Sequence, residues 1–199
     1  MTAWKRLFLA AVAVPFCLMG LGLLMALAPA EMTPRSLQVP GAVAIAETAP
    51  GLATAFYLGD SLYVLLALFF FLCLYRLAAQ ETALARGLAL IGIAAAFGKA
   101  AFDLAENLFF LQATAPVDPA SAWLLSMGKR ICGALCVLAF APLYPTSAPF
   151  ARIVQGLLLV TGIATLIGLW LPALMQANAM LLFFTAVAVA VSARRHAAY

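Results

Sequence analysis

Long apolar stretches alternate with short polar segments along almost the entire chain. A helix needs about 20 apolar residues to cross the roughly 30 Å hydrocarbon core of a bilayer, and runs close to that length recur through the sequence. The pattern therefore predicts an all-α fold, a polytopic membrane helix bundle that forms a single integral membrane domain over residues 1–199. Six transmembrane helices are expected, at about 7–28, 51–79, 88–112, 121–144, 153–170 and 173–192.

The composition supports this interpretation. Hydrophobic residues make up 67% of the chain and charged residues 9%, whereas about a quarter of a soluble domain is charged. With so much of the length in apolar spans, no room remains for a separate soluble domain. Membrane lipids are the expected surroundings, and the net charge of +4 does not indicate a nucleic-acid partner, because most basic residues lie where membrane topology places them.

The basic residues are distributed unevenly between the two sides of the expected bundle. In the expected outer connection, residues 29–50, the only basic residue is Arg35. Cytoplasmic flanks of membrane helices are enriched in Lys and Arg, so both termini are predicted to be cytoplasmic. The Ala- and Leu-rich composition favours a bacterial cytoplasmic (inner) membrane. The basic residues expected on the cytoplasmic side are Lys5, Arg6, Arg76, Arg86, Arg152, Arg194 and Arg195.

The first apolar stretch has features of a secretory signal peptide. Lys5 and Arg6 precede it, and the small residues Ala28-Pro29-Ala30 follow. However, the apolar run over 7–28 is longer than the 7–15 residues usual for the apolar part of a signal peptide, which favours a transmembrane helix. The outer connection 29–50 contains several prolines and is expected to be a loop, with a short segment on the membrane surface as the alternative.

The third predicted helix, 88–112, carries an unusual set of polar residues. Lys99, Asp103, Glu106 and Asn107 recur at i, i+4, i+7 and i+8, so they share one helical face. Ionisable groups inside a membrane are costly and normally face the bundle interior or a cavity. This face is therefore the candidate functional site.

Two basic residues of the next helix lie at the same depth. Lys129 and Arg130 are eight and nine residues below Ser121, and Asp103 is nine residues below Gln112, which is about 12–14 Å in each case. Folding the two helices into a hairpin brings Arg130 opposite Asp103, and the planar guanidinium suits a carboxylate.

Further contacts of the same site follow from these positions. Lys99 is expected to pair with Asp103 along its own helix, while Lys129 could reach Glu106, Asp60 or a bound ligand. The three basic and three acidic residues of the site balance in charge. The candidate charge cluster comprises Asp60, Lys99, Asp103, Glu106, Asn107, Lys129 and Arg130.

Residues that commonly bind metals and cofactors are scarce. The single histidine, His196, lies in the C-terminal tail, so no span offers an axial ligand for haem. The cysteines Cys17, Cys73, Cys132 and Cys136 all lie in apolar spans and are expected to be small packing residues. Neither a metal nor a cofactor is therefore expected, and no motif of a serine hydrolase or metalloprotease is present.

Three functions remain open. The first is binding or transport of a small or anionic ligand, in a pocket that opens outward between the second, third and fourth helices. The second is a non-catalytic subunit or assembly factor, which would dock a membrane protein partner through small residues such as Thr161, Ala164, Thr165 and Gly168. The third is a lipid-modifying intramembrane enzyme with Asp103 and Glu106 as acid and base. We leave open whether the protein is an enzyme, although the sequence favours a protein that is not one.

Overall fold

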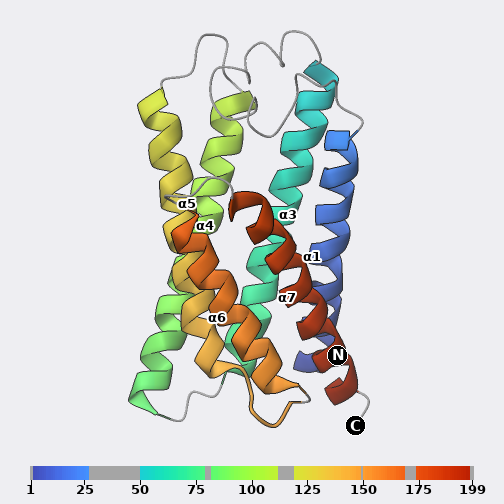
Figure 1. Cartoon of the computed structure of the whole chain (residues 1–199), viewed down its shortest axis with the longest axis vertical. Coiled ribbons are helices and arrows are strands. Elements are labelled where there is room, and N and C mark those ends of the chain that lie inside the picture. The colour runs from blue at the N-terminus through green and yellow to red at the C-terminus, as the bar shows by residue number, and fades with distance from the viewer. Residues whose placement is uncertain are drawn as a thin grey trace.

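The computed structural model describes residues 2–26, 50–78, 82–111, 119–148, 150–168 and 174–197. The described residues form a helix bundle, which confirms the predicted all-α class (Figure 1). The predicted outer connection 29–50 lies outside this part of the chain, except for Pro50. The helices are α1 (Ala3–Ala26), α3 (Pro50–Leu77), α4 (Ala83–Leu111), α5 (Pro119–Phe140), α6 (Ala151–Ile167) and α7 (Leu174–Ala197), and a short 3₁₀ helix, η1 (Ala141–Leu143), extends α5.

The helices form a closed ring. Each described helix packs against the next one along the chain, and α7 packs against α1 to complete the circle (Figure 1). Both termini lie at the same end of the bundle (Figure 1). The basic residues that the sequence analysis assigned to one side lie in the helix turns at this same end of the bundle. We call the end that holds both termini the basic end. The positive-inside pattern predicts that it is cytoplasmic.

Small residues allow α4 and α5 to pack closely. A Cβ atom added to Gly92 would lie 2.9 Å from the ring of Phe140, and one added to Gly98 would lie 3.0 Å from Cys132 Sγ. The first distance is too short for a real side chain and the second is tight, so both positions favour glycine. The close approach fixes the register of the two helices that carry the candidate charge cluster.

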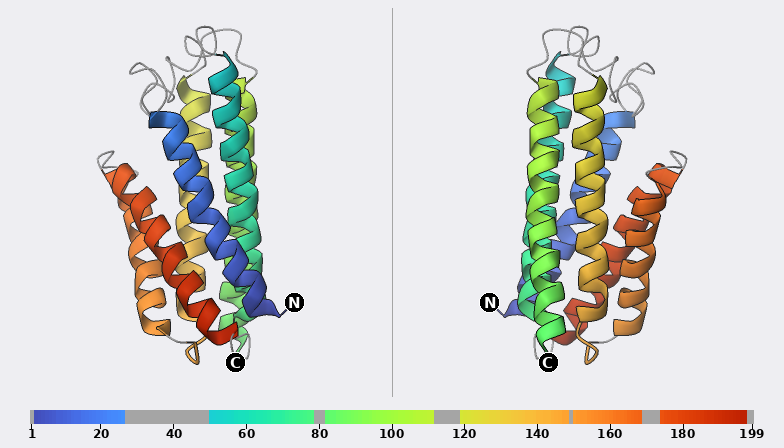
Figure 2. Two further views of the ribbon diagram at one scale, coloured as in Figure 1. Left: turned by 90° about the vertical axis from the view of Figure 1, so that its right-hand side faces the viewer. Right: turned by 90° about the vertical axis from the view of Figure 1, so that its left-hand side faces the viewer.

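The α6–α7 hairpin differs from the rest of the bundle. Five of the described helices are long and apolar enough to cross a membrane, whereas α6 has 17 residues, or about 25 Å. α6 ends at Ile167, where the sequence analysis placed the end of this helix at about residue 170. The upper end of the hairpin stops below those of the other helices (Figure 1) and leans away from them (Figure 2).

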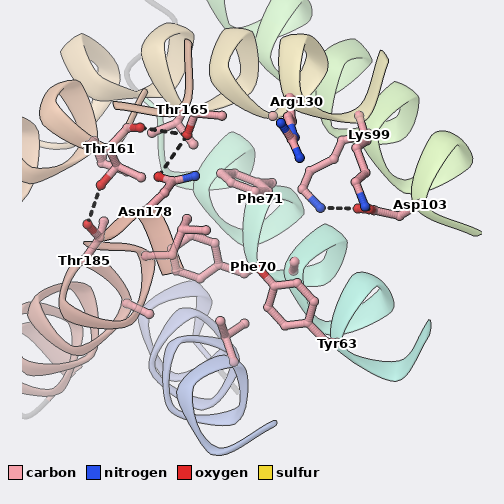
Figure 3. A pocket seen from close by; sticks show the side chains of 18 residues that line it. Tyr63, Phe70, Phe71, Lys99, Asp103, Arg130, Thr161, Thr165, Asn178 and Thr185 are labelled. Atoms are coloured by element: carbon pink, nitrogen blue, oxygen red, sulfur yellow. Dashed lines mark hydrogen bonds and ion pairs between the residues drawn. The ribbon is translucent and has the colours of Figure 1, made fainter. Parts of the chain in front are cut away.

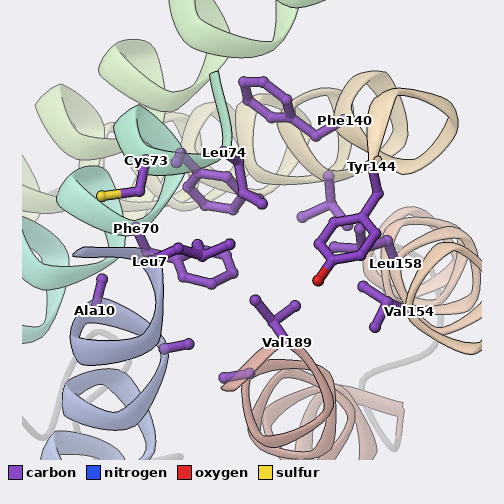
Figure 4. Packing of buried hydrophobic residues seen from close by; sticks show 14 of the residues in the cluster. Leu7, Ala10, Phe70, Cys73, Leu74, Phe140, Tyr144, Val154, Leu158 and Val189 are labelled. Atoms are coloured by element: carbon purple, nitrogen blue, oxygen red, sulfur yellow. The ribbon is translucent and has the colours of Figure 1, made fainter. Parts of the chain in front are cut away.

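The apolar core fills the half of the bundle nearer to the basic end. Side chains from α1, α3, α5, α6 and α7 meet there (Figure 4). The rings of Phe71 and Phe140 stack with centroids 5.9 Å apart, and Tyr144 Oη donates a hydrogen bond to Ser192 Oγ at 2.8 Å. This packing closes the centre of the bundle towards the basic end, so a polar cavity in the centre of the bundle lies above it.

Candidate functional site

A chain of alternating charges connects α4 to α5. Lys99 forms an ion pair with Asp103 on the same helix, and Lys129 of α5 forms one with Glu106. Lys129 Nζ also lies 3.4 Å from Asp103 Oδ1, which links the two pairs. The two carboxylate side chains are only 7% and 12% exposed. We call these four residues the ionic chain, in which both acids of α4 meet Lys129 of α5.

The residue of α5 that was predicted to pair with Asp103 was the wrong one. Lys129, not Arg130, approaches this carboxylate from α5. Successive residues on a helix are about 100° apart, so only one of these two side chains can face α4. Lys129 occupies that direction, where its compact ammonium lies between two carboxylates. Arg130 instead extends into the centre of the bundle (Figure 3).

Asp60 is held by an amide. Asn107 Nδ2 donates hydrogen bonds to Asp60 Oδ2 at 2.9 Å and to Ser61 Oγ at 3.1 Å. Ser61 Oγ in turn donates to the backbone oxygen of Tyr57 at 2.8 Å. The equal numbers of acids and bases in the cluster therefore do not produce three separate ion pairs in the described part of the chain.

A central cavity lies beside the ionic chain. It has a volume of about 190 Å³ and is lined by side chains from all six α-helices (Figure 3). Phe70, Phe71 and Leu158 belong both to its wall and to the apolar core, so the core closes it on the side of the basic end. Its charged wall comes from α4 and α5 and comprises Lys99, Asp103, Lys129 and Arg130.

A second polar wall, formed by α6 and α7, faces the cavity. Thr161 Oγ1 and Thr185 Oγ1 are hydrogen-bonded at 2.9 Å. Thr165 Oγ1 donates to the backbone oxygen of Thr161 at 2.8 Å and lies 3.1 Å from Asn178 Oδ1. The sequence analysis considered Thr161 and Thr165 as docking residues for another protein. In the structure both line this cavity, together with Asn178 and Thr185.

The charges on the cavity wall do not balance. Three cations and one carboxylate line it. The ionic chain pairs both lysines with acids, and Lys99 Nζ also lies 5.7 Å from the centre of the Tyr63 ring. Among the described residues, however, no carboxylate lies within 4 Å of the Arg130 guanidinium. The wall therefore presents to the cavity one guanidinium that has no ion pair in the described part of the chain, although the charge of Glu106 acts on it from farther away.

The predicted site residues fall into two groups. Lys99, Asp103, Lys129 and Arg130 line the cavity, whereas Asp60, Glu106 and Asn107 are absent from its wall and support residues near it. The pocket expected between the second, third and fourth helices is also bounded by α1, α6 and α7. Polar residues four apart on α6, Thr161 and Thr165, were the sequence signal that could have indicated the second wall.

Neither a group of metal ligands nor a similar protein of known function indicates what the site does. Within the described ranges, no three His, Cys, Asp or Glu side chains are grouped as metal ligands. Comparisons with protein-family models, with curated proteins and with solved structures found no match to this chain. The function is therefore argued from the geometry of the cavity.

Proposed function

We propose that the protein binds a small organic anion in its central cavity, within the membrane. The observation that carries this proposal is the Arg130 guanidinium, which extends into the cavity without a carboxylate partner among the described residues. A charged group within the membrane that has no direct ion pair is expensive and marks a functional position. A guanidinium can donate two parallel hydrogen bonds to one carboxylate or phosphate, which makes an anion its natural partner.

The size and the lining of the cavity restrict the body of this ligand. A volume of about 190 Å³ is somewhat larger than the roughly 150 Å³ engineered cavity that takes up benzene. The rings of Tyr63, Phe70 and Phe71 supply an apolar surface. The cavity therefore suits a compact carboxylate with an aromatic ring or a short aliphatic chain. Hydroxyl groups on the α6–α7 wall can bind a second polar group.

The other two functions explain less of the site. A purely structural network accounts for the ionic chain, in which each member has an oppositely charged neighbour, but it does not account for Arg130. Acid–base catalysis by Asp103 and Glu106 needs a carboxylate that is free to exchange protons with a substrate. Asp103 and Glu106 are both held by lysines, so the geometry favours binding over catalysis.

Binding of benzoate tests this proposal. Benzoate is a compact aromatic carboxylate, and benzamide and benzylamine are its neutral and cationic analogues. The purified protein should bind benzoate more tightly than either analogue. Arg130→Gln should weaken benzoate binding about tenfold or more, because a charge-assisted hydrogen bond contributes about 1.5–3 kcal/mol. Titration calorimetry in detergent measures both effects.

The matched control is Arg152→Gln, which removes one exposed arginine at the basic end. This variant should bind benzoate like the wild type. The proposal is wrong if Arg130→Gln and Arg152→Gln bind benzoate equally well, or if the three aromatic probes bind alike. Uptake of labelled benzoate into proteoliposomes by the same variants then distinguishes a transporter from a protein that only binds.

A further inference from the structure

A second pocket lies at the basic end, between α1 and α3. It has a volume of about 180 Å³ and is lined by Ala3, Arg6, Cys73 and Arg76. Arg6 belongs to the second turn of α1, and Arg76 lies in the last turn of α3. Two positive side chains from separate helices therefore share one small pocket, remote from the ionic chain.

The two arginines lack an acidic partner in the described part of the chain. The acidic residues described there are Asp60, Asp103 and Glu106, and all of them belong to the cluster near the central cavity. Two neighbouring guanidinium groups repel each other unless an anion lies between them. The described residues that line the pocket thus carry a charge of +2 and leave space for an anionic group.

We propose that this pocket binds the phosphate group of an anionic membrane lipid. Guanidinium forks match phosphate oxygens in geometry, and two of them can hold one phosphate from two sides. The apolar span of α1 begins at Ala3 and that of α3 ends at Leu77, so the pocket lies at the ends of both spans, where lipid headgroups are expected. Basic pockets between membrane helices on the cytoplasmic side are suited to anionic headgroups. The proposal is independent of the ligand in the central cavity.

Lipid binding to the full-length protein in detergent tests this assignment. Phosphatidylglycerol should raise the unfolding temperature, and phosphatidylcholine, which has no net charge, should not. The pocket variant is Arg6→Gln with Arg76→Gln. Its matched control is Arg86→Gln with Arg152→Gln, which removes two exposed arginines from the same end. Each basic residue near an anionic surface contributes about fivefold to binding without any pocket, and the control corrects for this.

The pocket variant should bind phosphatidylglycerol about tenfold more weakly than the control, because it loses the paired forks as well as two charges. Equal affinities would show only general attraction and would overturn the proposal. Arg6→Lys with Arg76→Lys keeps both charges and guards against misfolding of the glutamine variant. It should also bind more weakly than the control. If inorganic phosphate stabilises the wild type and phosphatidylglycerol does not, the pocket takes free phosphate and the lipid assignment is wrong.

Discussion

Replacing Lys129 with Gln should destabilise the protein far more than the same change at its neighbour Arg130. Lys129 connects Asp103 and Glu106, whose side chains are 7% and 12% exposed. Its removal leaves Glu106 without an ion pair among the described residues, with only the more distant charge of Arg130 acting on it, while Asp103 keeps Lys99. Arg130 forms no such pair, so its loss leaves no carboxylate uncompensated.

The loss of free energy of unfolding that we expect for Lys129→Gln lies between two limits. Removing one partner of a fully buried ion pair costs about 3–5 kcal/mol, and an average polar contact between membrane helices contributes about 0.6 kcal/mol. Lys129 is itself 26% exposed, and only one of its two carboxylates loses all its ion pairs. We therefore expect Lys129→Gln to lower the free energy of unfolding by about 2 kcal/mol. Arg130→Gln should change it by less than about 0.5 kcal/mol.

Unfolding by sodium dodecyl sulfate in mixed micelles, followed by circular dichroism, measures both values. A double variant, Lys129→Gln with Glu106→Gln, should recover at least about 1 kcal/mol, since neither charge then remains alone. The reasoning is refuted if Lys129→Gln and Arg130→Gln have the same effect, or if the double variant is as unstable as the sum of its single changes.

Two further changes test the packing and the second polar wall by the same unfolding assay. Gly92→Ala should cost about 2 kcal/mol, because the new methyl group would overlap the buried ring of Phe140. Gly87→Ala, on the same helix with open space around it, should instead stabilise by about 0.5–1 kcal/mol, and equal effects would contradict the packing argument. Thr161→Val should cost about 1 kcal/mol by leaving the Thr185 hydroxyl without its partner, and adding Thr185→Val should restore most of this loss. A double variant that is no more stable than Thr161→Val would show that the hydroxyl pair is not responsible.

The fold was predictable because the membrane leaves few alternatives. Every backbone group in the hydrocarbon must be satisfied within its own segment, so apolar runs of suitable length become helices. The depth of the charged residues in the membrane was also predictable. The rise per residue of a helix places Asp103 and Lys129 at matching distances from the helix ends. The ion pair between Lys99 and Asp103 needed only the spacing of four residues.

The direction of each side chain around its helix was harder to predict. Choosing between Lys129 and Arg130 requires the rotation of α5 against α4. That rotation is set by contacts such as those of Gly92 and Gly98, which a linear count of residues does not contain. The wall formed by α6 and α7 depends on the closure of the ring. Thr161 and Thr185 are 24 residues apart, and only the packing of the whole bundle brings both to the cavity.

The short α6 also affects the surrounding lipid. Its 17 residues cover about 25 Å, roughly 5 Å less than the hydrocarbon thickness of an average bilayer. Hydrophobic mismatch of this kind is relieved by local thinning, which costs a fraction of a kcal/mol per Å. Acyl chains beside α6 should therefore be compressed, and water on the side away from the basic end should lie closer to Arg130 there than elsewhere around the bundle. Bilayer thickness thereby becomes a variable that tunes how readily an anion enters the protein, with thin membranes favouring entry.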